Sequence, residues 1–113
     1  MTLQPFVERH PAHPGKRLTI FVNHRDRIGH KSILFEILKW VRKAGLAGVT
    51  VFQGHRSYGS DGRLHHTHLL SEASTQAIVI IDVPERIDAF LEDIGTLVSD
   101  VFIAIDEVEI VDT

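Results

Sequence analysis

The alternation of apolar and polar residues predicts six regular segments in the order strand, helix, strand, strand, helix, strand. Apolar runs rich in β-branched residues predict four strands, at 17–23, 49–52, 77–83 and 101–111. Apolar residues three and four positions apart predict two helices, one from Ile33 to a glycine cap at Gly45 and one that begins at Pro84. This order is the split βαβ pattern of a ferredoxin-like α+β domain, with a four-stranded antiparallel sheet and two helices on one face.

The same pattern predicts how the elements pack. The run 77–83 is apolar on both faces, which is typical of a central strand. Phe35 and Trp40 broaden the apolar stripe of the first helix. In the last strand the apolar positions change parity after Ile105, and one register cannot bury both sets, so we expect a bulge or break near Asp106.

Two right-handed crossovers determine which connections meet. The turn after the first strand, the loop between the second and third strands, and the turn before the last strand should share one end of the sheet. We therefore expect polar groups from two separate segments to lie at that end: Asn23, Arg25 and Arg27 with the start of the first helix, and Arg56, Tyr58 and Arg63.

The connection 54–65 is rich in glycine and carries basic and aromatic residues between two strands. Glycine lets backbone amides approach a ligand, arginine donates hydrogen bonds to anions, and a tyrosine ring offers a stacking face. A long hairpin connection alone would also explain the glycines. The candidate ligand-binding residues are Gly54, Arg56, Ser57, Tyr58, Gly59 and Arg63, together with Asn23, Arg25 and Arg27.

Composition narrows the class of protein. The 113 residues, of which 43% are hydrophobic, suit one domain, expected at 17–113, with a proline-rich flexible arm at 1–16. The formal charge of -3 argues against a nucleic-acid partner, as does the lack of an aromatic ladder along the strands. The chain has no cysteine and no long apolar run, so we expect a cytoplasmic protein that is not embedded in a membrane.

The sequence allows two other chemistries to be considered. His65, His66 and His68 could bind a divalent metal, with His66 and His68 on one face of a strand or His65 and His68 on one face of a helix. No carboxylate stands at ligand spacing, which favours ordinary loop histidines. A small phosphate-ester or acyl-phosphate hydrolase would need a glycine-rich cradle and a paired nucleophile and base, and neither is recognisable. We therefore expect a protein that is not an enzyme.

Four segments resemble a known family: 45–51, 57–59, 62–65 and 82–87, which read GLAGVTV, SYG, GRLH and DVPERI. They are similar to the PII-like proteins of domain of unknown function 190. The resemblance implies a ferredoxin-like homotrimer whose loop between the second and third strands touches a partner, as in PII signalling proteins. Some members are linked to fluoride-exporting membrane proteins, which implies a transporter as the regulated partner.

The resemblance also implies a ligand, because PII relatives bind small molecules, often adenine nucleotides, in clefts between subunits under that loop. The matching positions at the loop base are Gly54, Arg56, Ser57, Tyr58 and Gly59. PII proteins carry a glycine- and lysine-rich phosphate turn before the last strand, but 96–100 reads TLVSD here. A monophosphate, a cyclic nucleotide or another anion is therefore favoured over a triphosphate. The alternative is a metal-binding trimer that uses the three histidines.

Overall fold

The computed structural model describes residues 4–23, 26–54, 56–58, 64–66 and 75–113. Its elements, in chain order, are α1 (Phe6–Arg9), β1 (Ala12–Asn23), β2 (Arg27–Ile28), β3 (Lys31–Ser32), α2 (Ile33–Ala44), β4 (Thr50–Gln53), β5 (Arg56–Tyr58), β6 (Leu64–His66), β7 (Thr75–Asp82), α3 (Pro84–Ile94) and β8 (Phe102–Val111).

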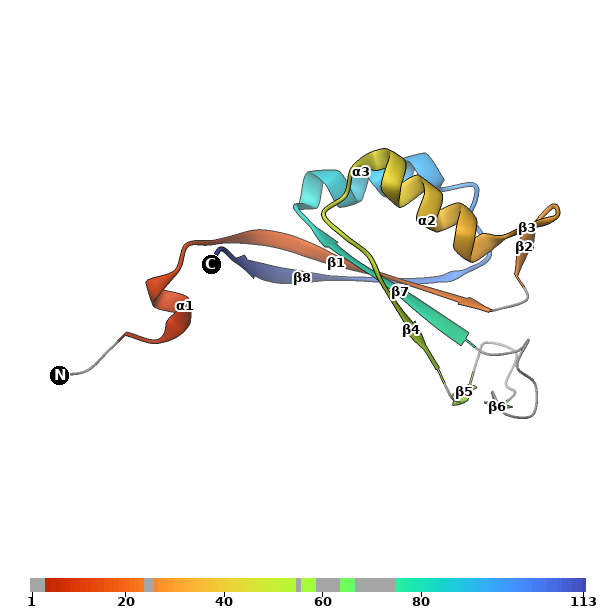
Figure 1. Ribbon diagram of the computed structural model, residues 1–113, viewed down its shortest axis with the longest axis horizontal. Coiled ribbons are helices and arrows are strands. Elements are labelled where there is room, and N and C mark those ends of the chain that lie inside the picture. Colours follow the sequence, from red (N-terminus) through yellow and green to blue (C-terminus); the bar gives the residue numbers. More distant parts are fainter. Residues whose placement is uncertain (1–3, 24–25, 55, 59–63, 67–74) are drawn as a thin grey trace.

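The main sheet has four antiparallel strands in the order β4-β7-β1-β8. Helices α2 and α3 cross one face of this sheet, and the other face is left open (Figure 1). The predicted ferredoxin-like fold is confirmed, including the central position of β7 and the start of α3 at Pro84. Helix α2 ends at Gly45, whose φ of 67° is the left-handed conformation that glycine adopts most readily.

The core lies between the helices and one face of β1 and β7. Its buried members alternate along the strands and recur at helical spacing: Leu18, Ile20, Val22, Ile33, Ile37, Val41, Ile78, Ile80, Ile87, Phe90, Ile94 and Val98. Trp40 packs against this core from α2 as predicted, whereas Phe35 does not belong to it and is 70% exposed. The apolar stripe of α2 is therefore narrower than the sequence indicated.

Strand β1 begins at Ala12, five residues before the strand predicted from the sequence, and pairs with β8 as far as Val111. The two strands form a long ribbon that runs beyond the helices (Figure 1). The predicted bulge near Asp106 was wrong, because the register is continuous through that residue. Beyond the helices the ribbon no longer has one buried face, so the parity of its apolar residues can change. Ile110, for example, covers Gly15, where an added Cβ would lie 2.5 Å from its Cδ1.

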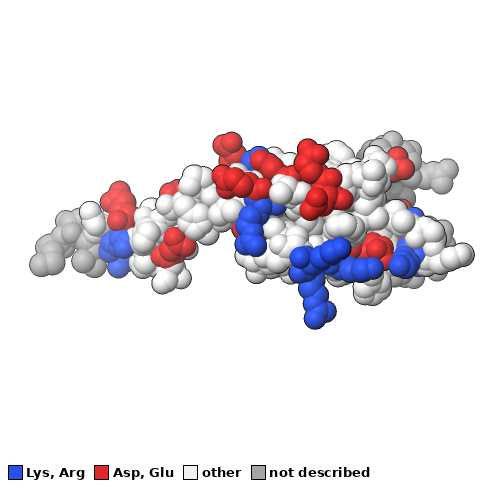
Figure 2. All heavy atoms as spheres, turned by 90° about the horizontal axis from the view of Figure 1, so that it is seen from above, with Lys and Arg blue, Asp and Glu red and all other residues white. Residues whose placement is uncertain are grey.

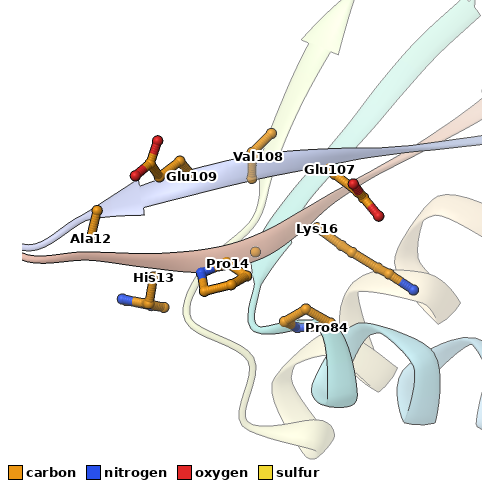
Figure 3. Close-up of a pocket in the computed structure, with 9 residues that line it drawn as sticks. Ala12, His13, Pro14, Lys16, Pro84, Glu107, Val108 and Glu109 are labelled. Carbon is orange, nitrogen blue, oxygen red and sulfur yellow. The ribbon is translucent and has the colours of Figure 1, made fainter. Parts of the chain in front are cut away.

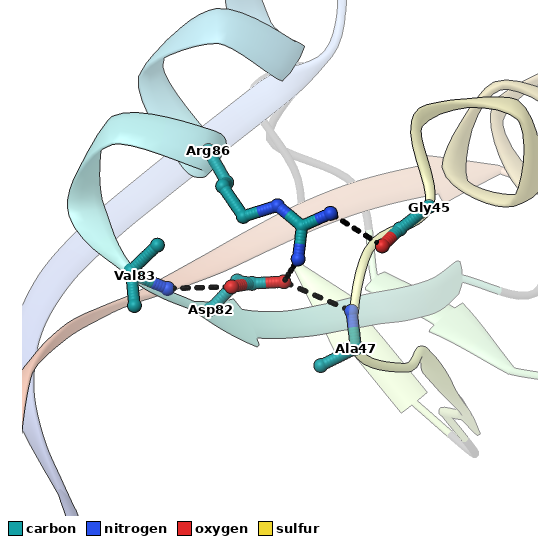
Figure 4. A network of polar contacts seen from close by, with 5 residues as sticks. All are labelled: Gly45, Ala47, Asp82, Val83 and Arg86. Atoms are coloured by element: carbon teal, nitrogen blue, oxygen red, sulfur yellow. Dashed lines mark hydrogen bonds and ion pairs between the residues drawn. The ribbon is translucent and has the colours of Figure 1, made fainter.

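A buried carboxylate joins three elements at the C-terminal end of β7 (Figure 4). Asp82, which is 6% exposed, accepts hydrogen bonds from the backbone N–H groups of Val83 (2.7 Å) and Ala47 (2.9 Å). Arg86 lies 3.7 Å from the same carboxylate and donates to the carbonyl of Gly45 at 2.8 Å. Two of the segments that carry the family resemblance therefore hold α2, β7 and α3 together.

Candidate functional site

The predicted meeting of connections at one end of the sheet is confirmed. Asn23, the last residue of β1, pairs with Thr75, the first residue of β7, and the carbonyl of Thr75 accepts a hydrogen bond from the N–H of Gly54 at 2.8 Å. Because Gly54 directly follows β4, these three residues form a row at the ends of β1, β7 and β4, which we call the loop end of the sheet. The β5–β6 hairpin follows β4 at this end (Figure 1).

A tight polar turn leads from β1 to α2. The N–H of Asn23 donates to the carboxylate of Asp26 at 2.8 Å, and the N–H of Asp26 donates back to the carbonyl of Asn23 at 2.9 Å. The carbonyl of Asp26 accepts from the first helical N–H, that of Ile33, at 3.1 Å and from Arg27 at 3.2 Å. Arg27 is thereby held at the loop end as an exposed cation. The short β2–β3 hairpin, whose Gly29 has a φ of 62°, was not predicted.

The predicted site residues divide into three groups. Asn23, Arg27 and Gly54 lie together at the loop end. The backbones of Arg56, Ser57 and Tyr58 form β5, which pairs with β6 through His65 and His66. Four residues lie outside the described part of the chain: Arg25, Gly59, Arg63 and His68. Among the described residues, no group of three potential metal ligands is found.

A pair of glutamines that was not predicted from the sequence lies beside this row. The side-chain amide of Gln76 on β7 donates to Oε1 of Gln53 on β4 at 3.3 Å. Within the described residues, Oε1 of Gln76 is a buried acceptor without a hydrogen-bond partner. Buried acceptors are normally satisfied, so this oxygen is a candidate contact for a donor group at the loop base. Its signal in the sequence was a polar residue at the start of an otherwise apolar strand.

The close approach of Gly54 to β7 gives a testable prediction about packing at the loop end. A Cβ at this position would lie 3.0 Å from the carbonyl oxygen of Thr75, closer than side chains normally pack. We expect Gly54→Ala to displace the strand that leads into the loop and to lower the free energy of unfolding by about 1–2 kcal/mol. Gly48→Ala is the matched control, since no atom lies within 4 Å of its added Cβ. Equal denaturation midpoints for the two variants would contradict this expectation.

The open face of the sheet carries an aromatic row. Phe52, Ala77, Phe21 and Phe102 are register partners across all four strands. The phenylalanines are 56%, 36% and 70% exposed in strand order, and the rings of Phe21 and Phe102 meet edge to face at 5.6 Å. The expectation that the strands lack an aromatic ladder was therefore wrong. Arg17 on this face is paired with Asp106 at 2.6 Å, so the row is not set in a basic surface.

The helix layer has a different surface. Figure 2 shows basic side chains gathered over α2 and acidic side chains over α3. Lys39, Arg42 and Lys43 form the basic group, and Glu85, Asp88 and Glu92 belong to the acidic one. A charged helix layer opposite an apolar sheet face means that association through the sheet would bury far less charge. None of the helices in the described residues is long and apolar enough to cross a membrane.

The turn before β8 is closed by its own backbone and apolar side chains. The N–H groups of Leu97 and Val98 donate to the carbonyl of Ile94 at 2.8 and 3.2 Å, and Val98 is only 5% exposed. This turn reaches the loop end, since Phe102 pairs with Phe21. It presents core-packing residues there rather than cations for a phosphate chain.

The sheet order and the two helices on one face define a ferredoxin-like fold. A model of the DUF190 family, described as an uncharacterized ACR, matches residues 15–110. The chain belongs to this family.

Solved structures share the fold at low sequence identity. CPII from Thiomonas intermedia K12, a nitrogen regulatory PII-like protein bound to ADP, AMP and bicarbonate, is 18% identical with a TM-score of 0.68, and the match covers 88% of this chain and 91% of CPII. A putative PII-like signaling protein from Thermus thermophilus is 19% identical with a TM-score of 0.58 over the same shares. The periplasmic divalent cation tolerance protein CutA from Archaeoglobus fulgidus is 14% identical with a TM-score of 0.54 and 81% of each chain covered.

Proposed function

We propose that this protein is a non-enzymatic, trimeric PII-like regulator that binds a small anionic ligand, with ADP or AMP as first candidates, in clefts between subunits at the loop end. Ligand contacts favour one conformation of the loop 54–65, and the loop reports this state to a partner protein. The observation that supports the proposal most is the row Asn23, Thr75 and Gly54, which joins the polar turn after β1 to the base of the glycine-rich loop.

Assembly is supported by surface that a monomer would leave in water. The open face exposes the row Phe21, Phe52 and Phe102, and β4 and β8 are edge strands. Apolar patches and unpaired strand edges favour association with another chain. The aromatic row lies next to the loop end in register, so association through it brings neighbouring subunits to the edge of the proposed ligand site.

The ligand class follows from the donors at the loop end. Arg27 and the loop arginines are suited to an anion, and Oε1 of Gln76 can accept from an exocyclic amine. The closed, apolar turn before β8 supplies no cations for a third phosphate. CPII, which has the same fold, was solved with ADP, AMP and bicarbonate, and this supports the choice of a mono- or diphosphate.

We propose that the partner is a membrane transporter and that the loop 54–65 contacts its cytoplasmic face. The regulator itself carries out no chemistry. Metal binding by His65, His66 and His68 is the second candidate, since the first two lie on β6 within the same hairpin as Arg56. Divalent metals therefore belong in the same ligand screen.

A thermal-shift screen with ADP, AMP, cyclic nucleotides, bicarbonate, zinc and copper tests the proposal. Saturating ligand stabilises the native state by mass action, and we expect ADP or AMP to raise Tm by about 5 °C or more. Arg56→Ala combined with Arg63→Ala should remove this rise and leave Tm without ligand unchanged. Lys39→Ala combined with Lys43→Ala removes two exposed charges from α2 and is the matched control. A rise in Tm with zinc or copper alone would support metal binding at the histidines and contradict the nucleotide site.

A further inference from the structure

A hollow of about 420 Å³ lies at the opposite end of the sheet from the loop end. It lies between the β1–β8 ribbon and the first residue of α3 (Figure 3). Ala12, Pro14 and Lys16 line it from β1, Glu107 and Glu109 from β8, and Pro84 from α3. Its size is that of a small ligand pocket or of a socket for a few side chains.

The charges around this hollow favour a cation. Nζ of Lys16 forms an ion pair with the carboxylate of Asp88 on α3 at 2.7 Å. Nδ1 of His13 contacts the carboxylate of Asp112 at 3.1 Å. Within the described residues, Glu107 and Glu109 make no hydrogen bond or ion pair through their side chains. An occupant should therefore combine apolar groups for the proline and alanine surfaces with a positive charge for the two carboxylates.

The segment 4–11, which we call the N-terminal arm, carries both kinds of group, since Phe6 and Val7 are apolar and Arg9 is a cation, and it also carries one acid, Glu8. Its one-turn helix α1 has no buried residue, and Phe6 and Val7 are 49% and 59% exposed. The arm is nevertheless held in shape by His10, which stacks on Phe6 at 3.9 Å, and by Nε of Arg9, which donates to the carbonyl of Gln4 at 3.0 Å. Ordering a segment costs conformational entropy, and the exposed apolar pair returns no burial in a single chain.

The arm does not face the hollow of its own chain. The carbonyl of Pro11 accepts from the N–H of Asp112 at 2.8 Å, which fixes the base of the arm to the end of the ribbon. From there α1 extends beyond the ribbon, away from α3, while the hollow opens between the ribbon and Pro84 (Figures 1 and 3). The arm can reach the hollow of another copy without a reversal of the chain direction at Pro11.

We propose that the N-terminal arm of one copy docks into the ribbon hollow of a neighbouring copy, with Phe6 and Val7 on the apolar surface and Arg9 against Glu107 and Glu109. Exchange of the same element between identical chains needs no new partner and closes each hollow in turn. The proposal does not depend on the nucleotide site.

The test uses single cysteines, because the natural chain contains none. Val7→Cys and Pro84→Cys chains with tags of different mass are co-expressed, oxidised mildly and separated on a non-reducing gel. We expect a mixed-tag dimer that forms at least about tenfold faster than with Ala89→Cys, an exposed control on α3 outside the hollow, because docking raises the effective concentration of the arm. Glu109→Cys is a second hollow position that avoids replacing the first residue of a helix.

Each other outcome overturns the proposal. Equal rates at Ala89→Cys and at both hollow positions would mean random collision. A chain that carries both Val7→Cys and Pro84→Cys and closes on itself at high dilution would place the arm in its own hollow. No cross-link at either hollow position would leave the hollow to another occupant.

Discussion

Phe102→Asp is expected to convert the proposed trimer into monomers. The side chain is 70% exposed in the single chain, and it ends the aromatic row on the open face. In the proposed assembly this row is buried, so each aspartate would be transferred out of water. The cost should be about 3 kcal/mol per chain or more, which weakens association at least about a hundredfold.

Phe35→Asp is the matched control for this experiment. Phe35 is also 70% exposed, but it lies on α2, in the helix layer on the other side of the sheet. Light scattering coupled to size exclusion should give monomers for Phe102→Asp and an unchanged mass for Phe35→Asp. Dissociation by Phe35→Asp alone would place the interface on the helices instead.

Asp82→Ala is expected to destabilise the fold far more than the loss of an exposed carboxylate. It removes the acceptor of two backbone N–H groups, those of Val83 and Ala47, in a position that is only 6% exposed. Each donor then loses a charged partner, and Arg86 loses its nearby carboxylate. We expect the free energy of unfolding to fall by about 2–4 kcal/mol, measured by urea denaturation.

Asp88→Ala provides the comparison, because it removes a carboxylate from the same helix region with different burial. Asp88 pairs with Lys16 at 2.7 Å, but its side chain is 57% exposed. Exposed ion pairs contribute little, so the change should cost less than about 1 kcal/mol. Similar losses for the two variants would mean that the Asp82 network adds no more than a surface pair.

Most of the fold could be predicted from the sequence because local periodicity determines it. The alternating run that ends at Asn23, the helical stripe that ends at Gly45 and the helix start at Pro84 each have a local physical signal. Chirality of the crossovers then placed Asn23 at the same end as Gly54. These predictions needed no knowledge of long-range contacts beyond the sheet topology.

The errors arose where distant segments decide the structure. Strand β1 starts at Ala12, in a proline-rich segment, because β8 offers it a partner as far as Val111. The continuous register through Asp106 depends on where the helices end, which no local pattern encodes. Likewise, the aromatic row becomes visible only when single phenylalanines from different strands are brought into register. The side chains of the loop 54–65 remain predictions from sequence.

The proposed function requires an anionic ligand to bind between subunits at the loop end. Calorimetric titration of ADP into the wild-type protein and into Phe102→Asp tests this requirement. Phe35→Asp is the control, because it places the same charge at an equally exposed phenylalanine on the helix layer. We predict saturable binding to the wild type and to Phe35→Asp, and none to the monomeric Phe102→Asp. Equal affinity for a folded, monomeric Phe102→Asp would contradict a site between subunits, and no binding of ADP or AMP to the wild-type assembly would contradict the nucleotide itself.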